Sequence, residues 1–526
     1  MIRDGKIWMA NTEDGQPVFM LPNKANRHGL IAGATGTGKT ITLKVMAESF
    51  SDMGVPVFLA DVKGDIAGML AQGKDSEDMQ KRIAKFGLDA HGFEYHNYPT
   101  TLWDVFGKNG IQLRTTVTEM GPTLLSRIMD LNDLQTDLLT IVFKIADDNN
   151  LALIDTKDLK SMLNEVGENS KEYEAEYGHI SKVSIGAIQR AVVALELAGG
   201  EIFFGEPALD IRDWFTVGEN GRGMIHILDS QSLINNGTLY SMFLLWMLSE
   251  LFETMPEVGD LDKPKMVFFF DEAHLLFKDT PKALLDKIEQ VVKLIRSKGI
   301  GVYFVTQNPR DIPDGVLAQL GNKVQHALHA YTPSDQKAVK AAADSFRENP
   351  AFKTADVIEA LGTGEAVASF LQEDGTPSIV EKVFILPPQS QMGGIDDSVR
   401  DSAIKSSVLY SKYATAVDAE SAYEILTRLG VEKTKAAEAA KEAEEAAKQQ
   451  AKEEAAAAKA AAREAEKEAN RKKRAVKSVG TTVVGTIGRE VGKKVGKQFG
   501  GKFGQTLGGN TGAQLFRGLL NTLLKG

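Results

Sequence analysis

The sequence contains no cysteine, and this absence excludes several kinds of protein. Without thiols the chain has no disulfide framework, no thiolate zinc site and no cysteine nucleophile, which fits a reducing compartment. The first residues, MIRDGKIWMANTEDG, also lack the basic-then-apolar pattern of a secretory signal. We therefore expect a cytoplasmic protein.

The sequence also lacks the long apolar run that a membrane-spanning helix requires. Such a helix needs about 20 consecutive, predominantly apolar residues. The best stretch, LYSMFLLWMLSELF from Leu239, is shorter and is interrupted by Ser241, Ser249 and Glu250. We predict a buried core helix there and no transmembrane segment.

Positive charge is scarce in most of the chain and is concentrated near its C-terminal end. Of the 61 basic and 71 acidic residues, twelve basic and one acidic residue lie in 471–526, which leaves residues 1–470 with 49 basic and 70 acidic residues. An acidic body does not favour a broad nucleic-acid surface. Any affinity for a polyanion is expected from the tail or from a local basic patch.

Residues 1–70 and 216–390 carry the pattern of a single α/β core, split into an N-terminal and a C-terminal part. Short apolar runs that end at a glycine or a polar residue predict buried strands, and helical spacing after the first of them predicts a βαβ unit. The predicted strands are GLIA, VPVFLAD, GMIHILD, KMVFFFD, GVYFVTQ and VQHALHAY, with VASFL and VEKVFIL as a terminal pair. We expect an α/β fold with a mostly parallel sheet, doubly wound by helices on both faces.

The remaining segments differ from this core in composition. Residues 71–215 are mostly polar with helical spacing and predict a long helical insertion, and 391–431 predict a helical connector. Residues 432–475 contain no Leu, Ile, Val, Met or Phe, so they predict a solvated Ala/Glu/Lys-rich helix or a linker.

The basic tail at 476–526 has a glycine every four residues from Gly488 to Gly512. Small residues at this spacing allow close helix packing. A flexible tail, self-association and contact with a membrane surface all remain open for this segment.

The stretch GATGTGKT carries the strongest chemical signal in the chain. It satisfies the phosphate-binding pattern G-x-x-x-x-G-K-[ST] and lies between a predicted strand and a predicted helix. Its glycines let backbone N–H groups point at phosphate oxygens, and the helix N-terminus adds its dipole. We expect Lys39 to reach the β- and γ-phosphates of ATP and the Thr40 hydroxyl to bind Mg²⁺. The predicted nucleotide-binding residues are Gly33, Ala34, Thr35, Gly36, Thr37, Gly38, Lys39, Thr40 and Ile41.

A P-loop enzyme also needs an acidic residue at the end of a buried strand, and the sequence offers two candidates. Asp61 ends VPVFLAD, and Asp271 ends KMVFFFD and is followed by Glu272. Paired carboxylates can divide the work, since one can hold the metal while the other polarises the attacking water. We therefore assign Asp271 to Mg²⁺ and Glu272 to water activation.

Polar and basic residues around GVYFVTQ supply the remaining candidates. Gln307 ends that strand, where its amide can bind the γ-phosphate or the attacking water. Arg296 and Arg310 flank the strand, and each is either an interface residue that acts in trans or a plain surface arginine. No histidine pair has metal-ligand spacing, and we expect His274 to support the helix that follows Asp271.

Taken together, the motifs GATGTGKT, DVKGD, FFFDEAH, VTQNP and LGNKVQHAL resemble the HerA-like branch of the HerA/FtsK P-loop ATPases over roughly residues 1–390. The resemblance implies a RecA-like core, ATP hydrolysis at subunit interfaces and a hexameric homo-oligomer. It also implies action on double-stranded DNA with a nuclease or other protein partner. It also implies that Lys39, Thr40, Asp271, Glu272 and Gln307 carry the chemistry. Where relatives are expected to have an arginine near LGNKVQHALHAYTP, this chain has His329.

Two functions follow from these observations. The first is a ring-shaped DNA translocase driven by ATP, which the resemblance favours. The second is an oligomeric ATPase switch or assembly factor that does not move nucleic acid and is tethered by its tail to a partner or a membrane surface. The acidic body and the short segment before Gly33, where the resemblance leads us to expect a β-barrel, favour the second.

Overall fold

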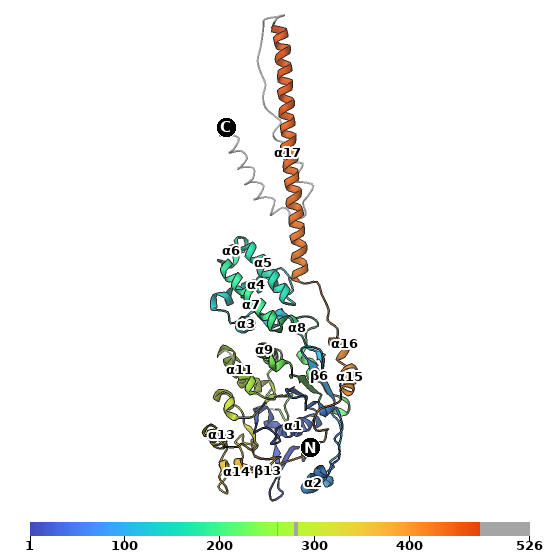
Figure 1. Ribbon diagram of the computed structural model, residues 1–526, viewed down its shortest axis with the longest axis vertical. Helices are drawn as coiled ribbons and strands as arrows, with labels where there is room; N and C mark the ends of the chain where they lie inside the picture. The colour runs from blue at the N-terminus through green and yellow to red at the C-terminus, as the bar shows by residue number, and fades with distance from the viewer. Residues whose placement is uncertain (260, 278–281, 474–526) are drawn as a thin grey trace. The chain divides into compact units, whose positions relative to one another are not determined.

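A 13-stranded sheet forms the core of the compact unit Met1–Lys433 in the computed structural model, which describes residues 1–259, 261–277 and 282–473 (Figure 1). The strand order is β1-β2-β13-β12-β11-β4-β10-β9-β5-β8-β6-β7, and β3 pairs with β2. The strands are β1 Ile2–Arg3, β2 Lys6–Thr12, β3 Pro17–Met20, β4 Gly29–Ala32, β5 Val57–Asp61, β6 Thr100–Asp104, β7 Ile111–Gln112, β8 Ile225–Asp229, β9 Met266–Phe270, β10 Ile300–Thr306, β11 Asn322–Gln325, β12 Glu365–Ser369 and β13 Glu381–Ile385.

The middle of this sheet is parallel and one side of it is antiparallel. All neighbours from β11 to β7 in the strand order pair parallel, whereas β12, β13, β2, β1 and β3 add antiparallel pairs. The mostly parallel α/β fold is therefore as predicted, including the terminal pair β12–β13.

Seventeen α-helices are found among the described residues. They are α1 Lys39–Asp52, α2 Glu77–Phe86, α3 Val117–Ile128, α4 Asp133–Asp148, α5 Thr156–Glu168, α6 Ser170–Tyr177, α7 Lys182–Leu195, α8 Glu201–Phe203, α9 Gly237–Thr254, α10 His274–Phe277, α11 Lys282–Ile295, α12 Asp314–Leu317, α13 Pro333–Asp344, α14 Thr354–Ala360, α15 Asp397–Ser406, α16 Tyr410–Tyr413 and α17 Ala422–Lys473.

Both faces of the central strands are buried, because their side chains alternate between two hydrophobic clusters. Along β9, Phe268 and Phe270 face one cluster, which also contains residues of α9 and α11. Val267 and Phe269 face the other, which contains residues of α1. Since successive residues of a strand point to opposite faces, this continuous apolar run is what a doubly wound sheet requires. The apolar stretch after Leu239 forms α9 and is a buried core helix, as predicted.

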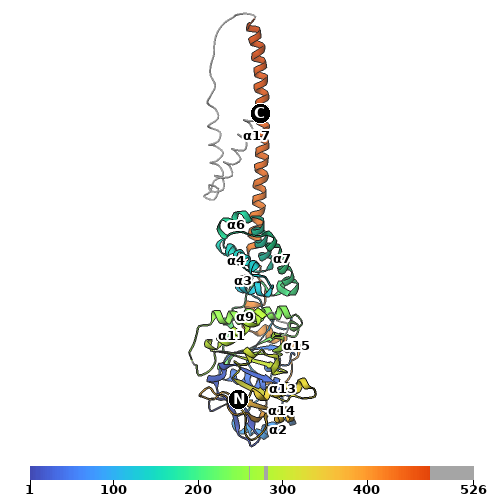
Figure 2. The same ribbon diagram turned by 90° about the vertical axis from the view of Figure 1, so that its left-hand side faces the viewer.

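The segment 71–215 contributes more to the sheet than expected. Strands β6 and β7 come from this segment and form the edge beyond β8, so its helices are α2, which precedes these strands, and α3–α8, which follow them. In both views α3, α4 and α7 gather beside α9, away from the sheet (Figures 1 and 2). The connector 391–431 contains α15, α16 and the start of α17.

One helical run among the described residues is long and apolar enough to cross a membrane, although the sequence led us to expect none. It extends from Lys182 to Phe203, and 33% of its apolar window is buried. Its buried side chains Ile185, Ile188 and Val192 belong to the same cluster as residues of α4 and α5. This pattern is that of an amphipathic helix that packs on its neighbours.

Two further predictions need correction. The strand expected for VQHALHAY is shorter, because β11 begins at Asn322 and ends at Gln325; beyond it the chain leaves the ladder and passes over the loop that follows β4. The edge strands β1–β3 were not predicted at all. An Asp-Gly turn between KIWMANT and PVFM was the available signal for that hairpin.

The chain divides into two compact units, Met1–Lys433 and Thr434–Gly526. The first contains the sheet and the helices around it. In the second, α17 continues to Lys473, and residues 434–464 are exposed along its length, as a helix without an apolar face must be. The predicted Gly-rich tail at 476–526 lies outside the described residues.

Candidate active site

The tips of three neighbouring strands, β4, β10 and β9, bring the predicted site residues to one edge of the sheet. In the parallel register Ala32 is paired with Thr306, and Phe304 with Phe270. The amide of Gly33 donates to the Thr306 carbonyl at 3.2 Å, and the amide of Ala273 donates to the Val305 carbonyl at 2.8 Å. The tip of β10 therefore holds both the phosphate-binding loop and the loop with the two carboxylates.

The phosphate-binding loop is curled around the side chain of Lys39. The Lys39 ammonium donates to the carbonyls of Gly33 at 2.7 Å and Ala34 at 3.0 Å, and the Thr37 hydroxyl donates to the Ala34 carbonyl at 2.8 Å. Gly38, with φ at 115°, adopts a backbone conformation that favours glycine. Lys39 then begins α1, so the start of that helix faces the loop.

A buried histidine packs against this loop. His326 follows β11, and its Nε2 lies 2.8 Å from the Thr42 hydroxyl, while its Nδ1 lies 2.9 Å from the Glu365 carbonyl. A Cβ on Gly33 would lie only 2.5 Å from the Cβ of His326. Burial lowers the pKa of His326 to about 4, so the ring is neutral at pH 7. The neutral imidazole thus packs against the phosphate-binding loop.

Of the two carboxylates after β9, Glu272 is the more constrained. Its backbone φ is 47°, its side chain is buried, and both carboxylate oxygens have partners. The Lys63 ammonium lies 2.8 Å from Oε1, and the Gln307 amide donates to both oxygens at 3.2 Å. Burial would raise the pKa of Glu272, but the hydrogen bonds and charge of Lys63, with help from Gln307, lower it below its usual range.

Asp271 lies beside it in a different environment. Burial, together with the charges of Glu272 and Asp61, raises the pKa of Asp271 to about 6, against the opposing charge of Lys63. Asp61, the other candidate, accepts backbone hydrogen bonds from Lys63, Gly64 and Ile66. The carboxylate oxygens of Asp61 thus hold the backbone of the loop after β5. Asp271 is therefore the better candidate for the carboxylate that binds Mg²⁺.

The residues near Asp271 fit a magnesium ion. A buried carboxylate and the half-buried hydroxyl-bearing Thr40 are hard oxygen donors, which Mg²⁺ prefers, and Mg²⁺ needs only one or two protein ligands beside phosphate and water. No cluster of three or more His, Asp or Glu ligands occurs within 1–259, 261–277 and 282–473.

The two candidate arginines lie at opposite ends of strand β10. Arg310 is in the 3-10 turn Pro309–Asp311 directly after β10, on the same edge as Gln307. Arg296 is in the turn Arg296–Lys298 that precedes β10. Because β10 spans seven residues, Arg296 lies roughly 20 Å from the nucleotide edge at ~3.3 Å per residue. Both side chains are exposed.

Lys63 was missed as a site residue by sequence reasoning, although DVKGD was noted as a motif. The signal was its place two residues after a buried strand, but its pairing with Glu272 depends on β5 being the neighbour of β9. His274 begins α10, as expected, and its Nδ1 also lies 3.4 Å from Glu272 Oε2. Both residues surround the carboxylate assigned to water activation.

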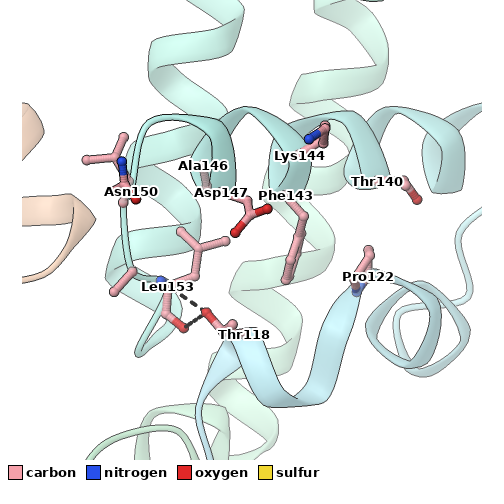
Figure 3. A pocket seen from close by; sticks show the side chains of 11 residues that line it. Thr118, Pro122, Thr140, Phe143, Lys144, Ala146, Asp147, Asn150 and Leu153 are labelled. Carbon is pink, nitrogen blue, oxygen red and sulfur yellow. Dashed lines mark hydrogen bonds between the residues drawn. The ribbon is translucent and has the colours of Figure 1, made fainter.

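A separate hollow of about 570 Å³ lies among the helices between α3 and α4 (Figure 3). Thr118 there exchanges hydrogen bonds with the backbone of Leu153, and Phe143 forms one wall. Its basic residue Lys144 is paired with Asp148 at 2.6 Å. The hollow is lined by residues of the helical segment, so it is distinct from the edge of the sheet that carries Lys39 and Glu272.

The sequence matches the family described as "Helicase HerA-like C-terminal" over residues 6–511. The chain belongs to this family. It is thus a member of the HerA/FtsK superfamily of P-loop ATPases, as the motifs predict, and its α/β core is the expected RecA-like fold.

Two curated relatives of this HerA-like chain are named DNA double-strand break repair helicase HerA. The protein from Sulfolobus acidocaldarius is 23% identical over 372 residues, and that from Sulfurisphaera tokodaii is 24% identical over 380 residues. Each match covers 70% of this chain and 66% of the relative, so the chain spans slightly less than two thirds of their length. Among solved structures, VirB4 of Thermoanaerobacter pseudethanolicus is similar with a TM-score of 0.45 and 15% identity, over 73% of this chain and 97% of that one.

Proposed function

We propose that this HerA-like protein hydrolyses ATP in a Mg²⁺-dependent reaction at the edge formed by β4, β10 and β9. The observation that carries the proposal is the meeting of Lys39, Glu272 and Gln307 at adjacent strand tips, with β10 bonded to the loops on both sides. Phosphoryl transfer depends mainly on positioning and charge stabilisation, and this edge supplies both.

Each residue then has a separate task. The amides of residues 33–41 cradle the phosphates, and Lys39 neutralises the β- and γ-phosphate charge. Thr40 and Asp271 would hold Mg²⁺, and the ion would supply positive charge that offsets the negative charge developing during transfer. Glu272 takes a proton from, or polarises, the attacking water, and Gln307 orients that water from the tip of β10.

We further propose that hydrolysis drives a ring-shaped oligomer, a hexamer by the family's implication, along double-stranded DNA. Family membership supports this proposal, as do the two relatives that are named as DNA repair helicases. A cytoplasmic location and a nuclease or other protein partner belong to the same proposal. Arg310 or Arg296 would then complete a neighbouring subunit's site in trans.

The acidic body supports a second candidate, an ATPase switch that does not move nucleic acid. Residues 1–470 carry 49 basic and 70 acidic residues, which disfavours a broad surface for DNA. In this version the basic tail at 476–526 tethers the oligomer to itself, to a partner or to a membrane surface. Deleting 476–526 would then change the oligomer size or the co-sedimentation with anionic vesicles.

ATP turnover with and without duplex DNA, at low and at moderate salt, separates the two candidates. The translocase predicts DNA-stimulated turnover and binding that weakens as salt rises, because counterions are released from phosphates. The matched control is Lys39→Ala, which removes phosphate binding and should abolish turnover in both conditions. Turnover that DNA does not change, without salt-dependent DNA binding, would favour the switch.

A further inference from the structure

Glu272 is held in the structure in a way that opposes the task proposed for it. Its Oε1 lies 2.8 Å from the Lys63 ammonium, and both of its oxygens accept from the Gln307 amide. A carboxylate that is stabilised by a cation and an amide at once is a weak acceptor for a water proton. Turnover therefore requires that at least one of these two donors leave Glu272.

Lys63 is a donor that can leave without a change in the backbone. The loop after β5 is fixed, since Asp61 accepts hydrogen bonds from the amides of Lys63 at 3.2 Å, Gly64 at 2.7 Å and Ile66 at 3.0 Å. The Lys63 side chain, in contrast, is 38% exposed, whereas the Glu272 side chain is only 6% exposed. The lysine side chain can thus rotate while the loop that carries it stays in place.

Lys63 also lies near Lys39, the residue expected to bind the terminal phosphates of ATP. The pKa of Lys39 is lowered by burial and next by the charge of Lys63, so the two ammonium groups share one region of the site. Two neighbouring cations repel each other unless an anion lies between them. A γ-phosphate bound by Lys39 would be that anion, and it carries more negative charge than a carboxylate.

We propose that Lys63 is a positioning residue that senses the γ-phosphate. It holds Glu272 through the ion pair, and when ATP binds it exchanges the carboxylate for a γ-phosphate oxygen, which frees Glu272 to act on water. ADP lacks that phosphate and leaves the ion pair in place. This inference rests on the proposed function, because it assumes that ATP binds at Lys39.

Binding of ADP and of a non-hydrolysable ATP analogue, measured by calorimetry, tests the exchange. Lys63→Gln keeps a hydrogen bond to Glu272 but removes the charge, so affinity for the ATP analogue should fall roughly tenfold or more, while affinity for ADP should change less than twofold. Lys63→Arg keeps the charge and should restore most of the preference for the analogue. Lys74→Met, an exposed lysine outside the site, is the matched control and should change neither affinity.

The outcomes separate this inference from the proposed function. If Lys63→Gln weakens both nucleotides equally, or weakens neither, the exchange at the γ-phosphate is refuted while nucleotide binding stands. Failure of Lys63→Arg to restore the preference would refute it too. If the wild-type protein binds neither nucleotide, the proposed function fails, and this inference fails with it.

Discussion

Replacement of His326 by leucine should destabilise the core and should do so in a pH-dependent way. A carbonyl oxygen can only accept, so Nδ1 donates to the Glu365 carbonyl, and Nε2 accepts from the Thr42 hydroxyl. Leucine has a similar size but makes neither bond. Each buried polar group left without a partner costs about 1–3 kcal/mol, so the free energy of unfolding should fall by about 2–4 kcal/mol at pH 7.

The size of this difference should shrink in acid, because only the wild-type protein has the buried imidazole. The pKa of His326 is lowered by burial from 6.5 to about 4, so the unfolded chain binds the proton more readily than the folded one. The contribution of the neutral ring is therefore present above pH 6.5 and is lost as the pH falls towards 4. Between pH 7 and pH 5 this loss amounts to about 2 kcal/mol.

Urea unfolding followed by tryptophan fluorescence is a suitable assay, since Trp8, Trp103, Trp214 and Trp246 are all buried in the core. The difference between wild type and His326→Leu is measured at pH 7 and pH 5. His329→Leu, which replaces an exposed histidine three residues away, is the control and should change stability by less than about 0.5 kcal/mol at either pH. A difference that stays constant or grows in acid would refute the assignment of a neutral, doubly bonded ring.

Three further predictions concern the site itself. Gly33→Ala would place a Cβ 2.5 Å from His326 Cβ and 3.0 Å from Thr37 Oγ1. Nucleotide affinity measured by calorimetry should therefore fall about tenfold or more. Unchanged affinity would show that the loop is not constrained at Gly33. Chelation of Mg²⁺ with EDTA should abolish ATP turnover and addition of Mg²⁺ should restore it, and turnover that persists in EDTA would contradict the roles of Thr40 and Asp271. Alanine at Arg310 or at Arg296 should lower turnover of the oligomer about 10³-fold without weakening ATP binding, whichever acts in trans; the assignment is wrong if neither variant does so.

The central strands could be predicted because burial on both faces leaves a plain trace in the sequence. The apolar run Met266–Phe270 indicates a strand covered on both sides, and GATGTGKT between a strand and a helix defines the loop at Lys39. These features depend on local sequence, and the structure places them as expected.

The features that were missed depend on which strands become neighbours. The contact of Lys63 with Glu272 exists because β5 pairs with β9, a pairing between residues 210 positions apart that no local pattern encodes. Strand β6 is as long as β9, but its sequence TTLWD is not an apolar run, and β7 has only two residues, so neither carries the pattern of a buried central strand. The early end of β11 follows from contacts with the loop at Gly33, which are likewise non-local.

The central claim, that Glu272 activates water for ATP hydrolysis, is tested most directly by Glu272→Gln. The amide has the same shape and can still accept a hydrogen bond from Lys63, so the fold and ATP binding should remain. Turnover measured as phosphate release should fall by about 10²–10⁴-fold, the usual contribution of a general base. Hydrolysis at the wild-type rate, with ATP binding intact, would contradict the account.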